Sequence, residues 1–305
     1  MNNCTIKAWV VDTDSAALLL DTSVSLARLA ITYEQLAKLR PCDYTFINAS
    51  IIYQDHAHLA ADVVISYQAL LNHLQDGHSQ DGYLQDCGLL IDSKTDGVID
   101  RTTNKVYQLT PYRQFINHAD SIQAQLASHA IQVMRWRQDN QFCPRCGNAV
   151  LIGDTGIDGA EYAAHCPNCH HRNYPKVQPC VIVAITRTHP DDGRLQILLA
   201  QHHHHHDGMY GLVAGFMEIG ESIEHAIHRE VFEEVGLRLH NLRYASSQPW
   251  PYPSNLMIGF YADYLSGDIT IQESELACAA FFYLDELPKI PNIGTIARQL
   301  IDGVQ

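Results

Sequence analysis

Residues 215–237 read GFMEIGESIEHAIHREVFEEVGL, and this stretch decides how the second half of the chain folds. Ser222 is a favoured residue before the first turn of a helix, and Gly236 is a favoured residue after the last turn. Between these positions, aliphatic side chains recur every four residues, at Ile223, Ile227, Val231 and Val235. The spacing predicts an amphipathic helix over 222–235 whose aliphatic stripe faces a hydrophobic core.

The same segment carries three glutamates on one side of the predicted helix. Glu230 and Glu234 are four residues apart and Glu233 lies between them, so the three carboxylates share a face about 100° from the aliphatic stripe. Like charges at this spacing destabilise a helix unless a cation lies between them, and hard oxygen ligands favour Mg²⁺ or Mn²⁺. Arg229 can orient a carboxylate through a bidentate pair. We expect a divalent-metal site here, with a solvated acidic face as the alternative.

Four cysteines upstream form two CxxC pairs, separated by residues 147–165: Cys143-Pro-Arg-Cys146 and Cys166-Pro-Asn-Cys169. Each pair directs two thiolates toward one point, and two such pairs complete the tetrahedral sulfur site that suits zinc. A redox motif would instead use a single CxxC beside a strand–helix–strand unit. All four positions are filled by protein ligands, so we expect one structural Zn²⁺ per chain.

Length, charge and cysteine usage narrow the class of protein. The 305 residues are 46% hydrophobic and 18% charged, which predicts a globular chain of about two domains at about 150 residues each. The formal charge of −14 argues against broad binding to nucleic acids or anionic membranes. No stretch has the apolar length of a transmembrane helix, and Asp12 and Asp14 interrupt the region where a signal peptide needs its apolar core. The nine cysteines fit a reducing compartment. We therefore expect a cytoplasmic protein.

The chain divides into three predicted parts: an N-terminal α+β domain at 1–140, a zinc ribbon at 141–173, and a domain of strands and helices at 174–305. In the first part we expect strands at 8–11, 47–53 and 89–91 and helices at 33–40, 59–74 and 115–138. It contains no catalytic motif, which favours a packing or dimerisation domain. In the third part we expect strands at 177–188, 195–201 and 256–264, a hairpin turn at 191–193, and a last helix at 295–301.

Residues 247–257 read SQPWPYPSNLM. Three prolines at alternate positions, Pro249, Pro251 and Pro253, favour an extended and stiff chain. Trp250 and Tyr252 lie among them and can present a flat ring to a nicotinamide or adenine base. The alternative is an apolar loop that is buried at a subunit contact.

Residues 215–237 agree with the Nudix box, G-x5-E-x7-R-E-U-x-E-E-x-G-U with U aliphatic, at every defined position. The chain therefore resembles the Nudix hydrolases. The resemblance implies an α/β/α sandwich and a hydrolase that acts on a nucleoside diphosphate linked to another group. It implies that divalent metals bind the diphosphate and activate water, with catalytic roles for Arg229, Glu230, Glu233 and Glu234.

The proline-containing segment resembles the SQPWPFPxS signature of the NADH pyrophosphatase branch of this family, with Tyr252 in place of Phe and Asn255 in place of the last Ser. That branch also has a zinc ribbon before the Nudix domain. It has a Glu and an aromatic residue before the third cysteine, as in Glu161-Tyr162, and a Tyr-Pro after the ribbon, as in Tyr174-Pro175. The resemblance covers about residues 141–305, together with the C-terminal GTIAR at 294–298.

The resemblance also implies ligands and substrate contacts outside the predicted helix. The main-chain carbonyl of Ala214 and the carboxylate of Glu275 would join Glu230 and Glu234 as metal ligands, with Glu273 as a rival for Glu275. The implied substrate-binding residues are Arg113, Glu161, Tyr174, Phe216, Gln248, Pro249, Trp250, Pro251, Tyr252, Pro253, Ser254, Asn255 and Ala297. Phe216 and Trp250 would flank one base, from two subunits of a homodimer.

The implied reaction hydrolyses NADH or NAD⁺ to NMN(H) and AMP, and the branch also removes NAD caps from RNA. Two other interpretations stay open. The chain could be a Nudix hydrolase that prefers ADP-ribose or another dinucleoside diphosphate, or a non-catalytic binding protein, although the complete set of box residues argues against the latter. For the histidine run at 202–206 we favour a solvated loop over a metal site.

Overall fold

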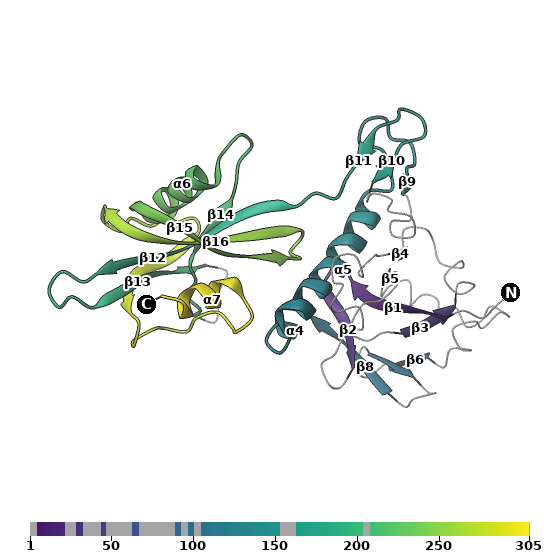
Figure 1. Cartoon of the computed structure of the whole chain (residues 1–305), viewed down its shortest axis with the longest axis horizontal. Coiled ribbons are helices and arrows are strands. Elements are labelled where there is room, and N and C mark those ends of the chain that lie inside the picture. The colour runs from purple at the N-terminus through teal and green to yellow at the C-terminus, as the bar shows by residue number, and fades with distance from the viewer. Residues whose placement is uncertain are drawn as a thin grey trace. The chain divides into compact units, whose positions relative to one another are not determined.

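The structure is a computed structural model that describes residues 5–21, 29–32, 44–46, 63–66, 89–92, 97–100, 105–152, 163–203 and 208–304. The chain divides into two compact units, which are shown in Figure 1. Unit 1 comprises Met1–Lys176 together with Pro251–Pro253, and unit 2 comprises Val177–Trp250 and Ser254–Gln305. The boundaries predicted at 140 and 173 stay predictions.

Unit 1 contains an eight-stranded sheet in the order β4-β5-β1-β2-β8-β7-β6, with β3 paired to β1. Its strands are β1 (Thr5–Asp12), β2 (Ala17–Asp21), β3 (Leu29–Thr32), β4 (Tyr44–Phe46), β5 (Val63–Ser66), β6 (Leu89–Asp92), β7 (Gly97–Asp100) and β8 (Lys105–Pro111). The strands predicted at 8–11 and 89–91 are confirmed. The helix predicted over 59–74 is wrong at 63–66, which form β5 and pair in parallel with β1. The predictions at 33–40 and 47–53 lie outside the described residues.

Two helices follow this sheet, α4 (Tyr112–Phe115) and α5 (Ser121–Asp139), and α5 packs on β1, β2, β4 and β5. The single helix predicted over 115–138 begins too early. Asp120 is extended and its carboxylate accepts a hydrogen bond from the main chain of Gln123, whose side chain bonds back to Asp120. This capping box starts α5 at Ser121. None of the described helices combines the length and the apolar character that crossing a membrane requires.

Residues 141–173 contain a small sheet in the order β11-β10-β9. Its strands are β9 (Leu151–Ile152), β10 (Ala164–His165) and β11 (Arg172–Asn173), and β10 pairs antiparallel with both neighbours. Strands of two residues bury little apolar surface. Cys143 and Cys146 precede β9, and Cys166 and Cys169 lie between β10 and β11.

Unit 2 contains a mixed sheet in the order β15-β16-β12-β13-β17, with β14 paired to β12. Its elements are β12 (Gln178–Thr188), β13 (Leu195–His202), β14 (Val213–Phe216), α6 (Ile223–Val235), β15 (Arg238–Trp250), β16 (Asn255–Ser266), β17 (Leu276–Tyr283) and α7 (Ile296–Asp302). β12 and β16 run parallel, and the other pairs are antiparallel. The strands, turn and helices predicted within 174–305 are confirmed, and β14, β17 and most of β15 were not predicted.

The two faces of this sheet are covered by different helices (Figure 1). Side chains alternate along β12, and Val181, Val183 and Ile185 share a core with Ile227, Val231 and Val235 of α6. The intervening Ile182 and Ala184 pack on the opposite face with Ile296, Leu300 and Ile301 of α7. This alternation makes unit 2 an α/β/α sandwich and confirms that the aliphatic stripe of α6 faces the core.

Candidate active site

Unit 2 has a cavity of about 670 Å³ beside the start of β12, β14 and helix α6. Its lining includes six residues that the sequence predicted for the site: Ala214, Phe216, Arg229, Glu230, Glu234 and Glu275. The other lining residues are Cys180, His202, His203, Gly215, Glu218 and Ser274. Three carboxylates from α6 and from the segment before β17 therefore face one cavity.

Helix α6 begins and ends at the residues that the sequence indicated. The Ser222 hydroxyl accepts a hydrogen bond from the main chain of His225 at 3.2 Å, and Gly236 adopts the left-handed conformation with φ of 73°. On β14, a methyl group at Gly215 would overlap the carboxylate of Glu230. The glycine therefore allows this strand to approach α6 closely enough for Glu230 to reach the cavity.

The Arg229 guanidinium donates hydrogen bonds to three carboxylates and to one main-chain oxygen of the segment 215–237. Its guanidinium forms a bidentate pair with Glu221, with both N–O distances 2.9 Å, and also donates to Glu230 at 2.9 Å and Glu233 at 3.0 Å. It further donates to the main-chain oxygen of Phe216 at 2.9 Å. The Arg229 guanidinium lowers the pKa of Glu221 to about 2. The bidentate partner is thus Glu221 in the loop before α6, and Arg229 fixes that loop onto the helix.

Glu234 is only 2% exposed, and its Oε2 atom has no hydrogen-bond partner among the described residues. Burial, together with the nearby carboxylates of Glu230, Glu275 and Glu233, raises the pKa of Glu234 to about 8. Burial also raises the pKa of Glu230. A buried carboxylate without a partner is unfavourable, and a divalent cation would supply the missing positive charge. The donor set fits Mg²⁺ or Mn²⁺.

The three helix glutamates do not share one environment. The Glu233 side chain is 51% exposed, is paired with Arg229, and does not line the cavity. The alternative of a solvated acidic face therefore describes Glu233, whereas the burial of Glu234 excludes it for that residue. Among the described residues, the cavity carboxylates are too widely spread for three ligand atoms to lie within 4.8 Å of one another.

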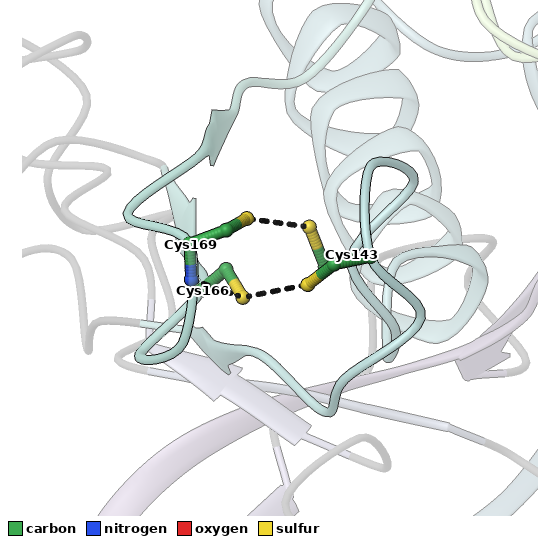
Figure 2. A group of neighbouring side chains, drawn as sticks. Cys143, Cys166 and Cys169 are labelled. Carbon is green, nitrogen blue, oxygen red and sulfur yellow. Dashed lines mark hydrogen bonds between the residues drawn. The ribbon is translucent and has the colours of Figure 1, made fainter.

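The four cysteines of the CxxC pairs do converge, and all their Sγ atoms lie within 4.8 Å of one another. The Sγ atoms of Cys143 and Cys169 are 3.6 Å apart (Figure 2), and those of Cys146 and Cys166 are 3.5 Å apart. Zinc–sulfur bonds of about 2.3 Å place tetrahedral sulfurs about 3.8 Å apart. A hydrogen bond from the Asn148 main chain lowers the pKa of Cys146 to about 6. The geometry fits one zinc ion.

The proline-containing segment is held at two places. In unit 2, the Gln248 amide donates to the Gly294 oxygen at 2.7 Å and accepts from the Ile296 main chain at 2.8 Å, at the start of the helix that carries Ala297. Pro249 and Trp250 lie on β15, Ser254 accepts a main-chain bond from Gln178 at 2.8 Å, and Asn255 is buried.

Within unit 1, Pro251–Pro253 contacts α4 and α5. The Tyr252 ring lies edge-on to Tyr112 at 6.3 Å, and the Arg113 guanidinium lies 4.6 Å from the centre of the Tyr252 ring. Arg135 donates to the carbonyl oxygens of Pro251, at 2.9 Å, and Pro253. Arg113 is therefore beside the predicted segment. Tyr174 is exposed in unit 1, and Glu161 lies outside the described residues.

Five cavity residues outside the set predicted for the site are Cys180, His202, His203, Glu218 and Ser274. Cys180 lies on β12, and burial raises the pKa of its thiol to about 12, with a smaller effect of Glu230 and Glu234. No local pattern distinguishes it from other core cysteines. His202 and His203 line the cavity. His202 is the last residue of β13, so the loop interpretation is wrong for it, whereas His203 is an exposed turn residue, as in a solvated loop. The other histidines of the run lie outside the described residues.

A NUDIX domain model matches residues 176–303. The NAD-capped RNA hydrolase NudC of Klebsiella pneumoniae is 44% identical over 178 residues, which are 58% of this chain and 65% of that protein. The chain thus spans less than two thirds of that relative. NudC of Shigella boydii is 44% identical over 190 residues, which are 62% of this chain and 69% of that protein.

A crystal structure of a Nudix hydrolase from Nitrosomonas europaea is 28% identical, with a TM-score of 0.38. The match covers 50% of this chain and 83% of that chain. The chain belongs to the Nudix family, in the branch that contains NudC.

Proposed function

We propose that this protein hydrolyses the diphosphate of NADH or NAD⁺ to NMN(H) and AMP, and that it removes NAD caps from RNA by the same reaction. The observation that carries the proposal is the buried Glu234 carboxylate, with one oxygen lacking a partner among the described residues, in a cavity shared with Glu230 and Glu275. A bound divalent cation would offset the cost of burying this carboxylate, and a metal-dependent hydrolase requires such a cation. The name of the NudC relatives supports the substrate.

The metal ligands proposed are Glu230, Glu234, Glu275 and the main-chain carbonyl of Ala214. When bound there, Mg²⁺ or Mn²⁺ would polarise the diphosphate and lower the pKa of bound water. Arg229 holds Glu230 and Glu233 at 2.9 and 3.0 Å, so these carboxylates keep a defined orientation without the ion. We assign Glu233 and Arg229 to the catalytic group with Glu230 and Glu234.

The substrate base would stack on an aromatic ring at the cavity. Phe216 is 51% exposed and lines the cavity, so its ring is available to a ligand. Trp250 is the proposed second ring, and Gln248, Ala297, Arg113 and the rest of the set predicted from the sequence are proposed contacts. If the two rings belong to different subunits, the enzyme is a homodimer, as the resemblance implies.

Two further proposals concern the whole chain. The cysteine quartet would hold one structural Zn²⁺, because four thiolates leave no position open for substrate. The zinc ribbon would lie between an N-terminal domain at 1–140 and the Nudix domain at 174–305. The cytoplasmic location rests on cysteine usage and stays a prediction.

Hydrolysis of NADH, NAD⁺, ADP-ribose and NAD-capped RNA should be compared on the purified full chain with Mg²⁺ or Mn²⁺. We expect NMN(H) and AMP from the dinucleotides, release of NMN(H) from capped RNA, and slower cleavage of ADP-ribose. Glu234→Gln is the matched inactive control. Faster cleavage of ADP-ribose than of NADH and NAD⁺ would contradict the proposal that NAD(H) is the preferred substrate. If none of the four compounds is cleaved, the proposal that the protein is an enzyme is wrong and a binding protein is favoured.

A further inference from the structure

Strand β13 ends in an irregularity at the wall of the cavity. Its pairing with β17 shifts register between Gln201 and His202, so that His202 is opposite Leu276. Bulges of this kind redirect side chains and are frequent beside active sites. His202 and His203, which follow the shift, both line the cavity. The start of the histidine run is therefore part of the site.

His203 makes two hydrogen bonds to the turn that precedes β17. Its main-chain nitrogen donates to the carbonyl oxygen of Glu275 at 3.1 Å. Its Nε2 atom lies 3.0 Å from the carbonyl oxygen of Glu273. Because a carbonyl oxygen only accepts, Nε2 carries the proton and donates it in this bond. The imidazole thus contacts the main chain of the turn that presents Glu275.

The other end of this turn is bonded to helix α6. The main-chain nitrogen of Gln272 donates to the carbonyl oxygen of Glu234 at 2.9 Å, and the Glu275 nitrogen donates to the Gln272 oxygen at 3.0 Å. Glu275 is therefore connected to Glu234 on one side and to His203 on the other. These main-chain bonds set the separation of two of the cavity carboxylates.

We propose that His203 is a positioning residue that holds the turn at 272–275 so that Glu275 faces Glu230 and Glu234 across the cavity. Where they are ionised, Glu230 and Glu275 repel each other across the cavity, which favours movement of the exposed Glu275 toward water. The Oε1 atom of Glu275 lies 3.4 Å from the side-chain nitrogen of Gln272 in the same turn. The imidazole bond opposes this outward movement before a cation binds. The proposal rests on the proposed function, because it assumes that Glu275 is a metal ligand.

Two substitutions separate the hydrogen bond from the volume of the side chain. His203→Leu keeps a similar bulk and removes the donor, whereas His203→Gln retains an N–H at a similar reach. The readout is the Kd for Mn²⁺ in the full-length protein without substrate, measured by electron paramagnetic resonance. Loss of an outer ligand contact costs about 10–100-fold in metal affinity, and this bond is exposed, so we expect about 5–10-fold weaker binding in His203→Leu. His203→Gln should bind within about twofold of the wild type.

His228→Leu is the matched control, because His228 is exposed on α6 and does not line the cavity. It should bind Mn²⁺ like the wild type. In His203→Leu, kcat at saturating Mn²⁺ should change less than the Mn²⁺ concentration for half-maximal rate, since enough cation restores the site.

A double-mutant cycle with Glu275→Gln tests whether His203 affects metal binding by positioning Glu275. The effect of Glu275→Gln on the Kd should be smaller in the His203→Leu background than in the wild type. Equal effects, an unchanged Kd in His203→Leu, or a His203→Gln variant as weak as His203→Leu would each overturn the proposal. The proposed function fails separately, if the wild type binds Mn²⁺ and cleaves no dinucleotide.

Discussion

Glu234 shows how a single buried group connects charge, stability and metal binding. Its pKa is raised from 4.5 to about 8, chiefly by burial, so without a cation the folded protein favours the protonated side chain. Protons and divalent cations therefore compete for this carboxylate. The affinity for Mg²⁺ should rise with pH until about 8 and then level off.

Substitution of Glu234 by Gln should lower the activity, but at neutral pH it should stabilise the metal-free fold. Gln keeps the shape and cannot provide the charge, so activity should fall by about 10²–10⁴-fold. The raised pKa stabilises the wild-type fold fully below pH 4.5, and this contribution is lost as the pH rises to about 8. Thermal unfolding without added Mg²⁺ or Mn²⁺ should therefore depend less on pH in Glu234→Gln over this range. Near wild-type kcat at saturating metal would show that the assignment is wrong.

Gly215→Ala tests the close approach of β14 to α6. The new methyl group would overlap the Glu230 carboxylate, which is the end of a flexible side chain and can move away. We expect kcat/KM to fall by about 10-fold or more because a ligand is displaced, while the melting temperature changes little. Ala at Gly211, where an added methyl group meets no atom within 4 Å, is the matched control. A Gly215→Ala enzyme with wild-type metal affinity and rate would refute this role of Glu230.

At the scale of elements, the sequence predicted the helices and strands whose ends are marked by residues that favour a start or a stop. Helix α6 has Ser222, Gly236 and an unbroken stripe, and β12 is a long apolar run. The elements that were wrongly predicted or missed depend on pairing between strands that are far apart in the sequence. Residues 63–66 form β5 because they pair in parallel with β1, and β15 begins with a polar sequence and pairs with β16 through three register shifts. The cavity was predicted at its box residues, but Cys180 and His203 reach it through strand pairing, which no local pattern reveals.

Residues 141–173, which we propose to be a zinc ribbon, are the segment whose stability should depend on a metal. In the described part of 141–173, the buried residues are Cys143, Ala164, Cys166 and Asn173, so there is almost no apolar core. Structural zinc contributes about 10–16 kcal/mol in isolated fingers. We expect about one tightly held zinc per chain, and Cys166→Ser should lose it and expose 141–173 to proteases. A zinc-free preparation that resists proteolysis within these residues would contradict this.

At the scale of the whole molecule, the segment 248–255 is shared by the two units. Gln248 is bonded to the start of α7 within unit 2, and Tyr252 contacts Tyr112 and Arg113 within unit 1. The sequence favoured a packing or dimerisation role for the N-terminal part. Within unit 1, the contacts of Tyr252 show that α4 also packs against Pro251–Pro253.

Trp250→Ala distinguishes the two interpretations of this segment. If the indole stacks on a substrate base, its loss removes about 1–3 kcal/mol, so kcat/KM for NADH should fall by roughly ten- to a hundredfold while Mn²⁺ affinity is unchanged. If the indole only packs a subunit contact, the variant should dissociate on gel filtration, and its activity should recover at high protein concentration. Kinetics and gel filtration on the same preparation decide between these results. A variant with an unchanged elution volume and an unchanged kcat/KM would remove Trp250 from the binding site, and the choice of NADH over other dinucleotides would then lose its aromatic support.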